Sequence, residues 1–140
     1  MWWIFALLSA FFAALTALFA KKGLNGVNSD LATAIRTVII LFISWSIVFF
    51  KGNFKTIGDL NRQNWIFLIL SGVATGLSWL FYFRALQLGE MGKVAVVDKL
   101  SLALTIVLAF VFLGEPMNWK TVIGGALVIA GSLVLILPGK

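Results

Sequence analysis

The sequence has no cysteine and no histidine, and only 11% of its 140 residues are charged. Without cysteine there is neither a disulfide framework nor thiolate chemistry, and without histidine the commonest general base and metal ligand are missing. A single acidic residue lies well inside an apolar run, so no pair of carboxylates is available for acid and base chemistry. We therefore expect no enzyme activity, no catalytic residue, no metal site and no cofactor.

Apolar residues take the place of the missing charge. They make up 61% of the chain, and the mean hydropathy is +1.06, whereas a soluble domain is about half apolar and about a quarter charged. The net charge of +6 comes from cations at the ends of apolar runs rather than on one continuous face. That pattern is typical of membrane proteins and not of nucleic-acid binding. The composition predicts an integral membrane protein whose partner is the lipid bilayer, with no nucleic-acid partner.

Five apolar segments are separated by short polar loops. Each is close to the roughly 20 residues that a helix needs to cross about 30 Å of hydrocarbon. The segments are approximately residues 2–20, 31–50, 65–86, 94–113 and 119–137. None of the loops between them is long enough to form a domain. We predict an all-α polytopic membrane protein, one domain over residues 1–140, with five transmembrane helices.

The loop cations give no clear membrane orientation. Five helices put the termini on opposite sides of the membrane, so each loop can be assigned to one side. The cations are Lys51, Lys55, Arg62 and Lys120 on the side of the N-terminus, and Lys21, Lys22, Lys93 and Lys140 on the other. Because cytoplasmic loops normally carry the excess of Lys and Arg, this near tie permits insertion in both directions. The other interpretation is a single orientation with different helix boundaries.

The segment VAVVDKLSLALTIVLAF sets Asp98 and Lys99 side by side inside an apolar run. Adjacent helical residues point roughly 100° apart, so we predict no ion pair between the two. Arg36 and Arg84, at a similar depth, are the candidate partners of Asp98, although a long side chain such as that of Arg84 can instead extend to the interface. This predicted charge cluster of four residues is net positive. It therefore suits an anionic or zwitterionic solute better than a cation.

Polar residues recur at helical spacing in the third and fourth segments. Asp98, Ser101 and Thr105 lie at positions i, i+3 and i+7 of one face. The stripe of the third segment consists of Ser71, Thr75, Ser78 and Tyr82. In lipid such stripes face other helices or a water-filled cavity. The alternative is that each hydroxyl bonds the backbone of its own helix, four residues earlier.

The last segment, KTVIGGALVIAGSLVLIL, contains small residues at helical spacing. Gly124 and Gly131 lie one heptad apart, and Ala126 and Ala130 have the spacing of a small-xxx-small motif. Small side chains let two helix backbones approach closely. We predict a helix-packing face, and the spacing leaves open whether it packs within the chain or between two chains as a dimerisation face.

The residues from Tyr82 to Leu137, YFRALQLGEMGKVAVVDKLSLALTIVLAFVFLGEPMNWKTVIGGALVIAGSLVLIL, resemble the second half of an EamA domain from the drug/metabolite transporter superfamily. The resemblance rests on FRAL before a short loop, FLGEP after the fourth segment and IGGALVIAGSLVL as the closing helix. The chain is most similar to the small single-domain, five-helix members, in which DKLS is a typical motif. There a proline often precedes the motif, whereas Val96 and Val97 stand here. Their presence argues against a helix break at Asp98.

The resemblance implies one half, a single repeat, of a drug/metabolite transporter fold. Full-length relatives carry two inverted five-helix repeats around a central cavity, and alternating access needs both halves. The implied function is export or exchange of a small polar metabolite by a dimer of half-size units. The dimer would be an antiparallel homodimer or a pair with a related half-transporter, in a prokaryotic inner membrane. The alternative is a non-transporting membrane subunit or scaffold of a heteromeric complex.

The resemblance also implies a solute pathway lined by the first, third and fourth helices. Its candidate residues are Ser71, Ser78, Trp79, Tyr82, Asp98, Ser101 and Thr105. Two roles are open for Asp98, the acid that lies well inside a span. It couples transport to protons or sodium, or it forms a structural ion pair that orients the third and fourth helices.

Overall fold

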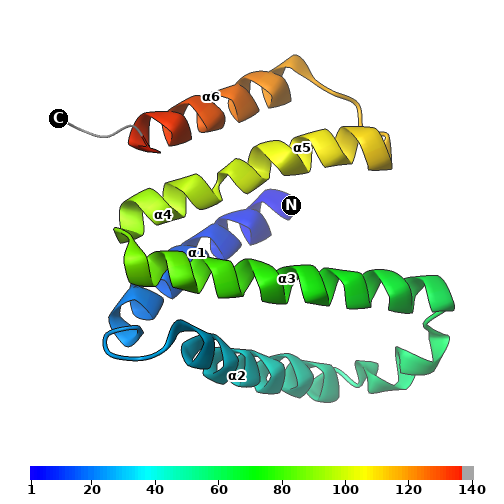
Figure 1. Cartoon of the computed structure of the whole chain (residues 1–140). Coiled ribbons are helices and arrows are strands. Elements are labelled where there is room, and N and C mark those ends of the chain that lie inside the picture. The colour runs from blue at the N-terminus through cyan, green and yellow to red at the C-terminus, as the bar shows by residue number, and fades with distance from the viewer. Residues whose placement is uncertain (137–140) are drawn as a thin grey trace. The chain divides into compact units, whose positions relative to one another are not determined.

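The structure, a computed structural model, describes residues 1–136, and every regular element in this range is a helix. In chain order these are α1 (Trp2–Gly23), α2 (Ser29–Phe50), the 3-10 helix η1 (Asn53–Asp59), α3 (Arg62–Leu88), α4 (Met91–Asp98), α5 (Leu100–Leu113) and α6 (Trp119–Ile136) (Figure 1). The predicted end of the last helix at residue 137 lies outside the described residues. Helices satisfy their own backbone N–H and C=O groups, which is what a chain in hydrocarbon requires.

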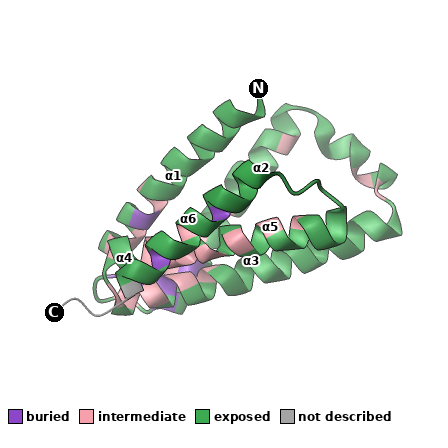
Figure 2. Ribbon diagram, turned by 90° about the horizontal axis from the view of Figure 1, so that it is seen from above, coloured by how far each residue is buried: buried purple, intermediate pink, exposed green. Residues whose placement is uncertain are grey.

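Four stretches of the described chain are long and apolar enough to cross a membrane. By length and composition they are α1, α2, α3 and the combined stretch Met91–Leu113, while α6 is a shorter apolar helix. Most of their large apolar side chains are exposed (Figure 2). Apolar surface of this extent needs lipid or another protein to cover it. The prediction of an all-α, multi-pass integral membrane protein is confirmed, whereas a fifth membrane span stays a prediction.

Asparagine caps set the beginnings of α2 and α3. The Oδ1 atom of Asn28 accepts a hydrogen bond from the backbone N–H of Asp30 at 2.8 Å. Asn61 accepts one from the N–H of Asn64 at the same distance, 2.8 Å. Each cap satisfies an N–H group that has no partner in the first turn of a helix. The two helices therefore begin at residues 29 and 62, earlier than the predicted 31 and 65.

Other boundaries also differ from the prediction, since α3 ends at Leu88 instead of residue 86 and α4 begins at Met91 instead of residue 94. Helix α1 continues through Lys21 and Lys22, which the sequence placed in a loop. Cations are favoured in a last turn because the helix dipole is negative at that end. The loop after α2 contains η1, where the ring of Phe54 stacks on Phe49 with centroids 5.3 Å apart.

Contacts along the chain gather in two units. One comprises Met1–Leu18 with Leu88–Lys140, and the other comprises Phe19–Gln87. In the first unit α6 runs back alongside α4 and α5 (Figure 1). In the second, α2 and α3 run in opposite directions and are joined through η1 (Figure 1).

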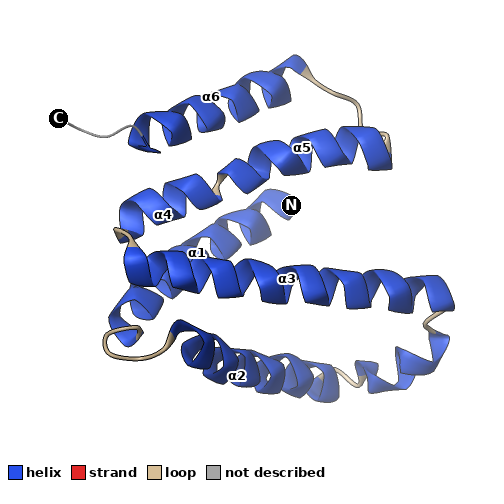
Figure 3. Cartoon of the chain, in the orientation of Figure 1, coloured by secondary structure: helices blue, strands red, loops and turns tan. Residues whose placement is uncertain are grey.

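The predicted fourth helix is divided in two. Helix α4 ends at Asp98 and α5 begins at Leu100, with a short connection between them (Figure 3). At this point the N–H of Lys99 bonds the carbonyl of Val96 at 3.0 Å, three residues earlier instead of four. The expectation of an unbroken helix, which rested on the missing proline, was wrong. The helix is interrupted here without the loss of an N–H group that proline would cause.

Gly125 and Ser132, one heptad apart, lie on the face of α6 that packs within the chain. Both are buried, and a Cβ atom on Gly125 would lie 3.0 Å from the Cδ1 atom of Ile106 in α5. A Cβ atom on Gly124 or Gly131 would meet nothing within 4 Å among the described residues. The face predicted from Gly124, Gly131, Ala126 and Ala130 is exposed at all four positions. Its role in contacts between chains stays a prediction.

Replacing Gly125 with leucine should destabilise the packing of α5 on α6. The new side chain would collide with Ile106, and overpacking of this kind costs about 1–3 kcal/mol. Gly124→Leu is the matched control, because it brings the same gain in helix propensity but points its side chain away from α5. We would measure unfolding in a detergent that keeps the chain monomeric. Equal stability of the two variants would contradict this assignment of the packing face.

Candidate functional site

The guanidinium group of Arg36 in α2 lies over aromatic rings of α3. Its Cζ atom is 4.0 Å from the ring centroid of Trp79 and 5.1 Å from that of Phe83. The two rings share one face of α3 because they are four residues apart. Aromatic faces attract cations, most strongly where water is scarce. A partly exposed positive charge is thus held inside an apolar helix of membrane length.

Polar groups on the same face of α2 are satisfied locally. Ser29 and Thr33, seven and three residues before Arg36, are buried. The hydroxyl of Thr33 donates to the carbonyl of Ser29 at 2.8 Å, and that of Thr37 donates to the carbonyl of Thr33 at 2.8 Å. Hydroxyls that bond their own helix carry no free hydrogen-bonding capacity as donors. The charge of Arg36 is therefore the main polar feature of this face.

Three side-chain hydrogen bonds stabilise the C-terminal end of α3 in the second unit, Phe19–Gln87. Gln87 Nε2 donates to the carbonyl of Val27 at 3.0 Å, and Arg84 Nη1 donates to Gln87 Oε1 at 3.1 Å. Lys21 Nζ donates to the carbonyl of Leu86 at 2.6 Å. These bonds tie the end of α3 to the end of α1 and to the loop before α2. The last carbonyl groups of a helix have no partners within the helix, so cationic and amide donors stabilise them.

In the first unit, Ser132 of α6 bonds the backbone at the interruption between α4 and α5. Its hydroxyl lies 3.1 Å from the carbonyl oxygen of Val96 and 2.8 Å from that of Val128. In an uninterrupted helix the Val96 carbonyl would accept from the N–H of Leu100. Here it accepts from Lys99, and it shares the single hydroxyl proton of Ser132 with the carbonyl of Val128, which lies closer. A hydroxyl from the neighbouring helix thus replaces part of a lost backbone bond, and interrupted membrane helices need such partners.

Asp98 and Lys99 form an ion pair at this interruption. Lys99 Nζ lies 3.8 Å from Asp98 Oδ2, and both side chains are partly exposed. The prediction that these neighbours would not pair was wrong. It assumed a regular helix in which the two side chains diverge, whereas Lys99 stands at the point where the regular bonding pattern fails.

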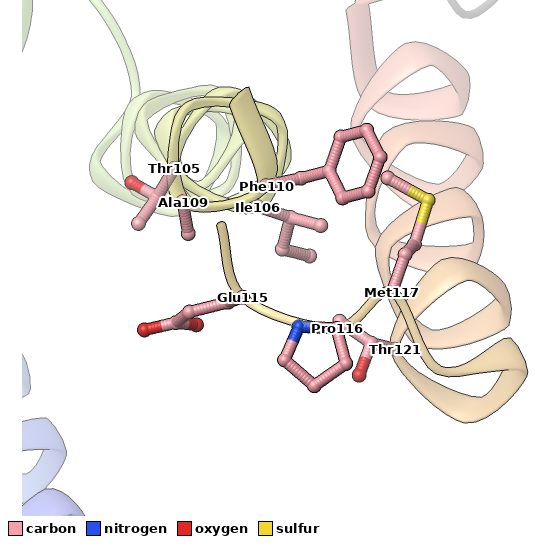
Figure 4. A pocket seen from close by; sticks show the side chains of 8 residues that line it. All are labelled: Thr105, Ile106, Ala109, Phe110, Glu115, Pro116, Met117 and Thr121. Carbon is pink, nitrogen blue, oxygen red and sulfur yellow. The ribbon is translucent and has the colours of Figure 1, made fainter. Parts of the chain in front are cut away.

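A small cavity of about 170 Å³ lies at the end of α5 and the loop that follows (Figure 4). It is lined by Thr105, Ile106, Ala109, Phe110, Glu115, Pro116, Met117 and Thr121. Gly114 ends α5 with a left-handed backbone at φ 65°, which lets the chain turn toward Glu115. Pockets for whole metabolites usually measure about 300–1,000 Å³. The cavity can hold water or a small group, and we assign it no solute.

Comparison with known proteins identifies the family. The sequence matches the family model of the EamA-like transporter family over residues 1–137. The chain belongs to this family. The resemblance drawn from the FRAL, DKLS and FLGEP motifs is thereby confirmed.

Two relatives match this EamA-like chain over almost its whole length. An "Uncharacterized transporter in cobO 3'region" from a Sinorhizobium species is 49% identical over 96% of this chain and 95% of its own length. An "Uncharacterized transporter YxxF" from Bacillus subtilis is 28% identical over 91% of this chain. The chain spans 40% of the length of that second relative. No solved structure matches.

The predicted polar stripes contain threonines that bond their own helices. Thr75 donates to the carbonyl of Ser71 at 2.9 Å, and Thr105 donates to the carbonyl of Ser101 at 2.8 Å. The alternative of backbone bonding therefore holds for both threonines. Ser71, Ser101 and Ser78 are exposed on their helices, and their predicted contact with solute remains untested.

The predicted charge cluster is divided between the two units. Arg36 and Arg84 belong to the second unit, where one lies on Trp79 and the other bonds Gln87. Asp98 and Lys99 belong to the first unit. The joint cluster of these four residues stays a prediction. The contact of Trp79 and of the partly exposed Tyr82 with solute also stays a prediction.

Sequence reasoning missed the residues that hold these sites in place. Phe83, Gln87, Gly125 and Ser132 were assigned no role. Trp79 and Phe83 were visible in the sequence as an aromatic pair at positions i and i+4, and Arg36 was visible as an arginine inside an earlier apolar segment. The pairing of Gly125 with Ser132 was visible as a second heptad spacing beside the first. Nothing local in the sequence distinguished these patterns from ordinary apolar packing.

Replacing Ser132 with alanine should loosen the interruption between α4 and α5. Loss of the bond to Val96 should lower stability by about 1 kcal/mol and speed hydrogen exchange of the amides of residues 99–102. Ser46→Ala is the matched control, because Ser46 bonds only the carbonyl of Phe42 in its own helix. Hydrogen exchange measured by mass spectrometry in detergent distinguishes the two. Unchanged exchange at residues 99–102 in Ser132→Ala would show that the bond does not maintain the break.

Proposed function

We propose that this chain is a half-size transporter unit that exports or exchanges a small polar metabolite by alternating access. Membership of the EamA-like transporter family supports transport in general, and the apolar helices support a multi-pass position. Helix α6 would be the fifth span. Its 18 residues reach about 27 Å at 1.5 Å per residue, and local thinning of the bilayer accommodates a mismatch of this size.

The observation that carries the proposal is the interruption of an apolar span at a charged pair. Helix α4 has 8 residues and is about 12 Å long, so Asp98 and Lys99 would lie well inside the hydrocarbon. Charges at this depth are costly and usually serve transport or proton transfer. Interrupted helices also form the solute and ion sites of many secondary transporters.

The proposed pathway is lined by polar groups of α5 and α3. Ser101 and Thr105 continue from Asp98 along α5, and the resemblance to EamA domains assigns the polar groups of α3 to the same pathway. Those groups are Ser71, Ser78, Trp79 and Tyr82. Polar side chains exposed on membrane helices face water or protein rather than lipid. This supports a polar solute rather than a lipid.

The proposed assembly is a dimer of half-size units, as an antiparallel homodimer or with a related half-transporter. The Sinorhizobium relative is matched over 95% of its own length, so that protein has the same extent. In the Bacillus relative the match covers 40% of the length, so that protein is more than twice as long as the matched region. Two oppositely inserted copies would supply the inverted halves that alternating access uses. The near tie of loop cations is compatible with dual insertion in a bacterial inner membrane.

Reporter fusions at the two ends of the chain test the assembly. Fusions before Met1 and after Lys140, assayed in intact cells with a reporter active only in the cytoplasm and one active only outside, should each report both locations. The expected ratio is near one, because the loop cations are balanced. Adding three lysines to the loop after α2 should shift the ratio toward one orientation. A single orientation for wild type would contradict the antiparallel homodimer.

Replacing Asp98 with asparagine tests whether this acid couples transport to an ion gradient. In proteoliposomes supplied with labelled amino acids and short carboxylic acids, gradient-driven accumulation should fall by about tenfold or more, because the variant cannot bind a proton or sodium as a carboxylate does. Exchange of solute without a gradient should continue. Asp59→Asn, at an exposed acid in η1, is the matched control and should accumulate solute normally.

The same variant separates the two roles of Asp98. If the carboxylate only orients helices through its pair with Lys99, Asp98→Asn loses stability and exchange together. Full gradient-driven accumulation by Asp98→Asn would exclude the coupling role.

A further inference from the structure

Arg36 carries a charge that its own unit does not neutralise. The acidic residues of Phe19–Gln87 are Asp30 and Asp59, and neither pairs with Arg36. Among residues 1–136 the ion pairs join Lys93 to Glu90 and Lys99 to Asp98. The guanidinium stays protonated in proteins, so a full positive charge remains, supported by aromatic rings.

The position of this charge is inside the predicted span. Arg36 lies six residues after Asp30 in α2, which corresponds to about 9 Å along the helix. Its side chain is partly exposed rather than sealed in a core. A small solute in an aqueous pathway could therefore reach it, whereas a buried structural arginine would be inaccessible.

The contact with Trp79 does not use up the hydrogen-bonding capacity of Arg36. Its Cζ atom lies 4.0 Å from the ring centroid, Tyr82 interacts with it electrostatically, and the guanidinium carries five N–H donors in one plane. No described residue accepts a hydrogen bond from these groups. The planar fork matches the two oxygen atoms of a carboxylate or phosphate group. Stacking restricts the side chain and so lowers the entropy lost on binding.

A purely structural role for Arg36 is poorly supported. The neighbouring end of α3 is already fastened by Gln87 on Val27 and Lys21 on Leu86. An apolar side chain at position 36 would pack on Trp79 and Phe83 without the cost of placing a charge in the span. A charged residue at this place needs a reason that packing does not supply.

We propose that Arg36 binds the oxyanion group, a carboxylate or phosphate, of the transported solute, and that Trp79 and Phe83 position its guanidinium. This inference rests on the proposed transport function and adds the chemical class of the solute. The solute is an organic acid or an acid-bearing zwitterion, held by paired hydrogen bonds to the guanidinium edge. In this proposal Trp79 holds the guanidinium of Arg36 in position through its aromatic ring.

Binding can be tested separately from transport. The purified full-length chain in phosphatidylcholine nanodiscs is heated with lactate, succinate or glycerol 3-phosphate, each compared with its neutral counterpart lactamide, succinamide or glycerol. At least one acid should raise the melting temperature while its neutral counterpart does not, because a bound ligand stabilises the folded state. Arg36→Gln should weaken the binding of that acid by about tenfold or more.

Matched variants separate binding from folding. Arg62→Gln removes the same group from the exposed start of α3 and should bind the acid like wild type. Arg36→Lys keeps the charge but loses the planar fork, so its affinity should lie between wild type and Arg36→Gln. Trp79→Ala should weaken binding several-fold, and Trp79→Phe should restore most of the affinity because it keeps an aromatic face. If Arg36→Gln fails to fold, the proposal is tested by whether Arg36→Lys binds the acid more weakly than wild type does.

The outcomes distinguish the proposal from its alternatives. The proposal is overturned if none of the three acids raises the melting temperature of wild type. It is also overturned if an acid raises the melting temperature of Arg36→Gln or of Arg36→Lys as much as that of wild type. If phosphatidylglycerol nanodiscs stabilise wild type but not Arg36→Gln, and the soluble acids have no effect, the oxyanion is a lipid headgroup and the solute assignment fails. Acid binding through Arg36 without flux in proteoliposomes would instead refute the proposed transport function and leave the binding site standing.

Discussion

Hydrocarbon offers no hydrogen-bond partner, and the structure follows from how the chain meets that constraint. Backbone groups are paired within helices, so the described chain is helical throughout its regular elements. Hydroxyls bond their own helix, as Thr105 does to the carbonyl of Ser101. Where the backbone pattern fails, a side chain from another helix contributes, as Ser132 does at Val96. These hydroxyls find their hydrogen-bond acceptors within the protein.

The same constraint explains why the remaining charges are informative. A charge inside a span is retained only where something stabilises it. Arg36 is stabilised by the faces of Trp79 and Phe83 in one unit, and Asp98 by Lys99 at a helix interruption in the other. The two sites have complementary chemistry. One presents a cation, and the other presents a carboxylate paired with a lysine.

Local signals in the sequence predicted the helices better than their contacts. Apolar runs of membrane length located every long helix, while the asparagine caps placed the beginnings of α2 and α3 a little earlier than hydropathy did. The break at Lys99 was missed because its partner Ser132 lies 36 residues beyond Val96. Arg36 was predicted as a site residue, but its aromatic support was not, because Trp79 and Phe83 belong to another helix.

The sequence by itself determined the class of the protein, since helix formation and membrane insertion depend on the composition of each local segment. It also determined membership of the EamA-like transporter family through motifs that are read along the chain. Only the tertiary structure decided which face of α6 packs on α5, because Gly124 and Gly125 are chemically identical and differ only in what lies opposite. It likewise decided the interruption at Lys99 and the ring platform under Arg36. Each of these depends on side chains that are distant in sequence and become neighbours only when the helices pack.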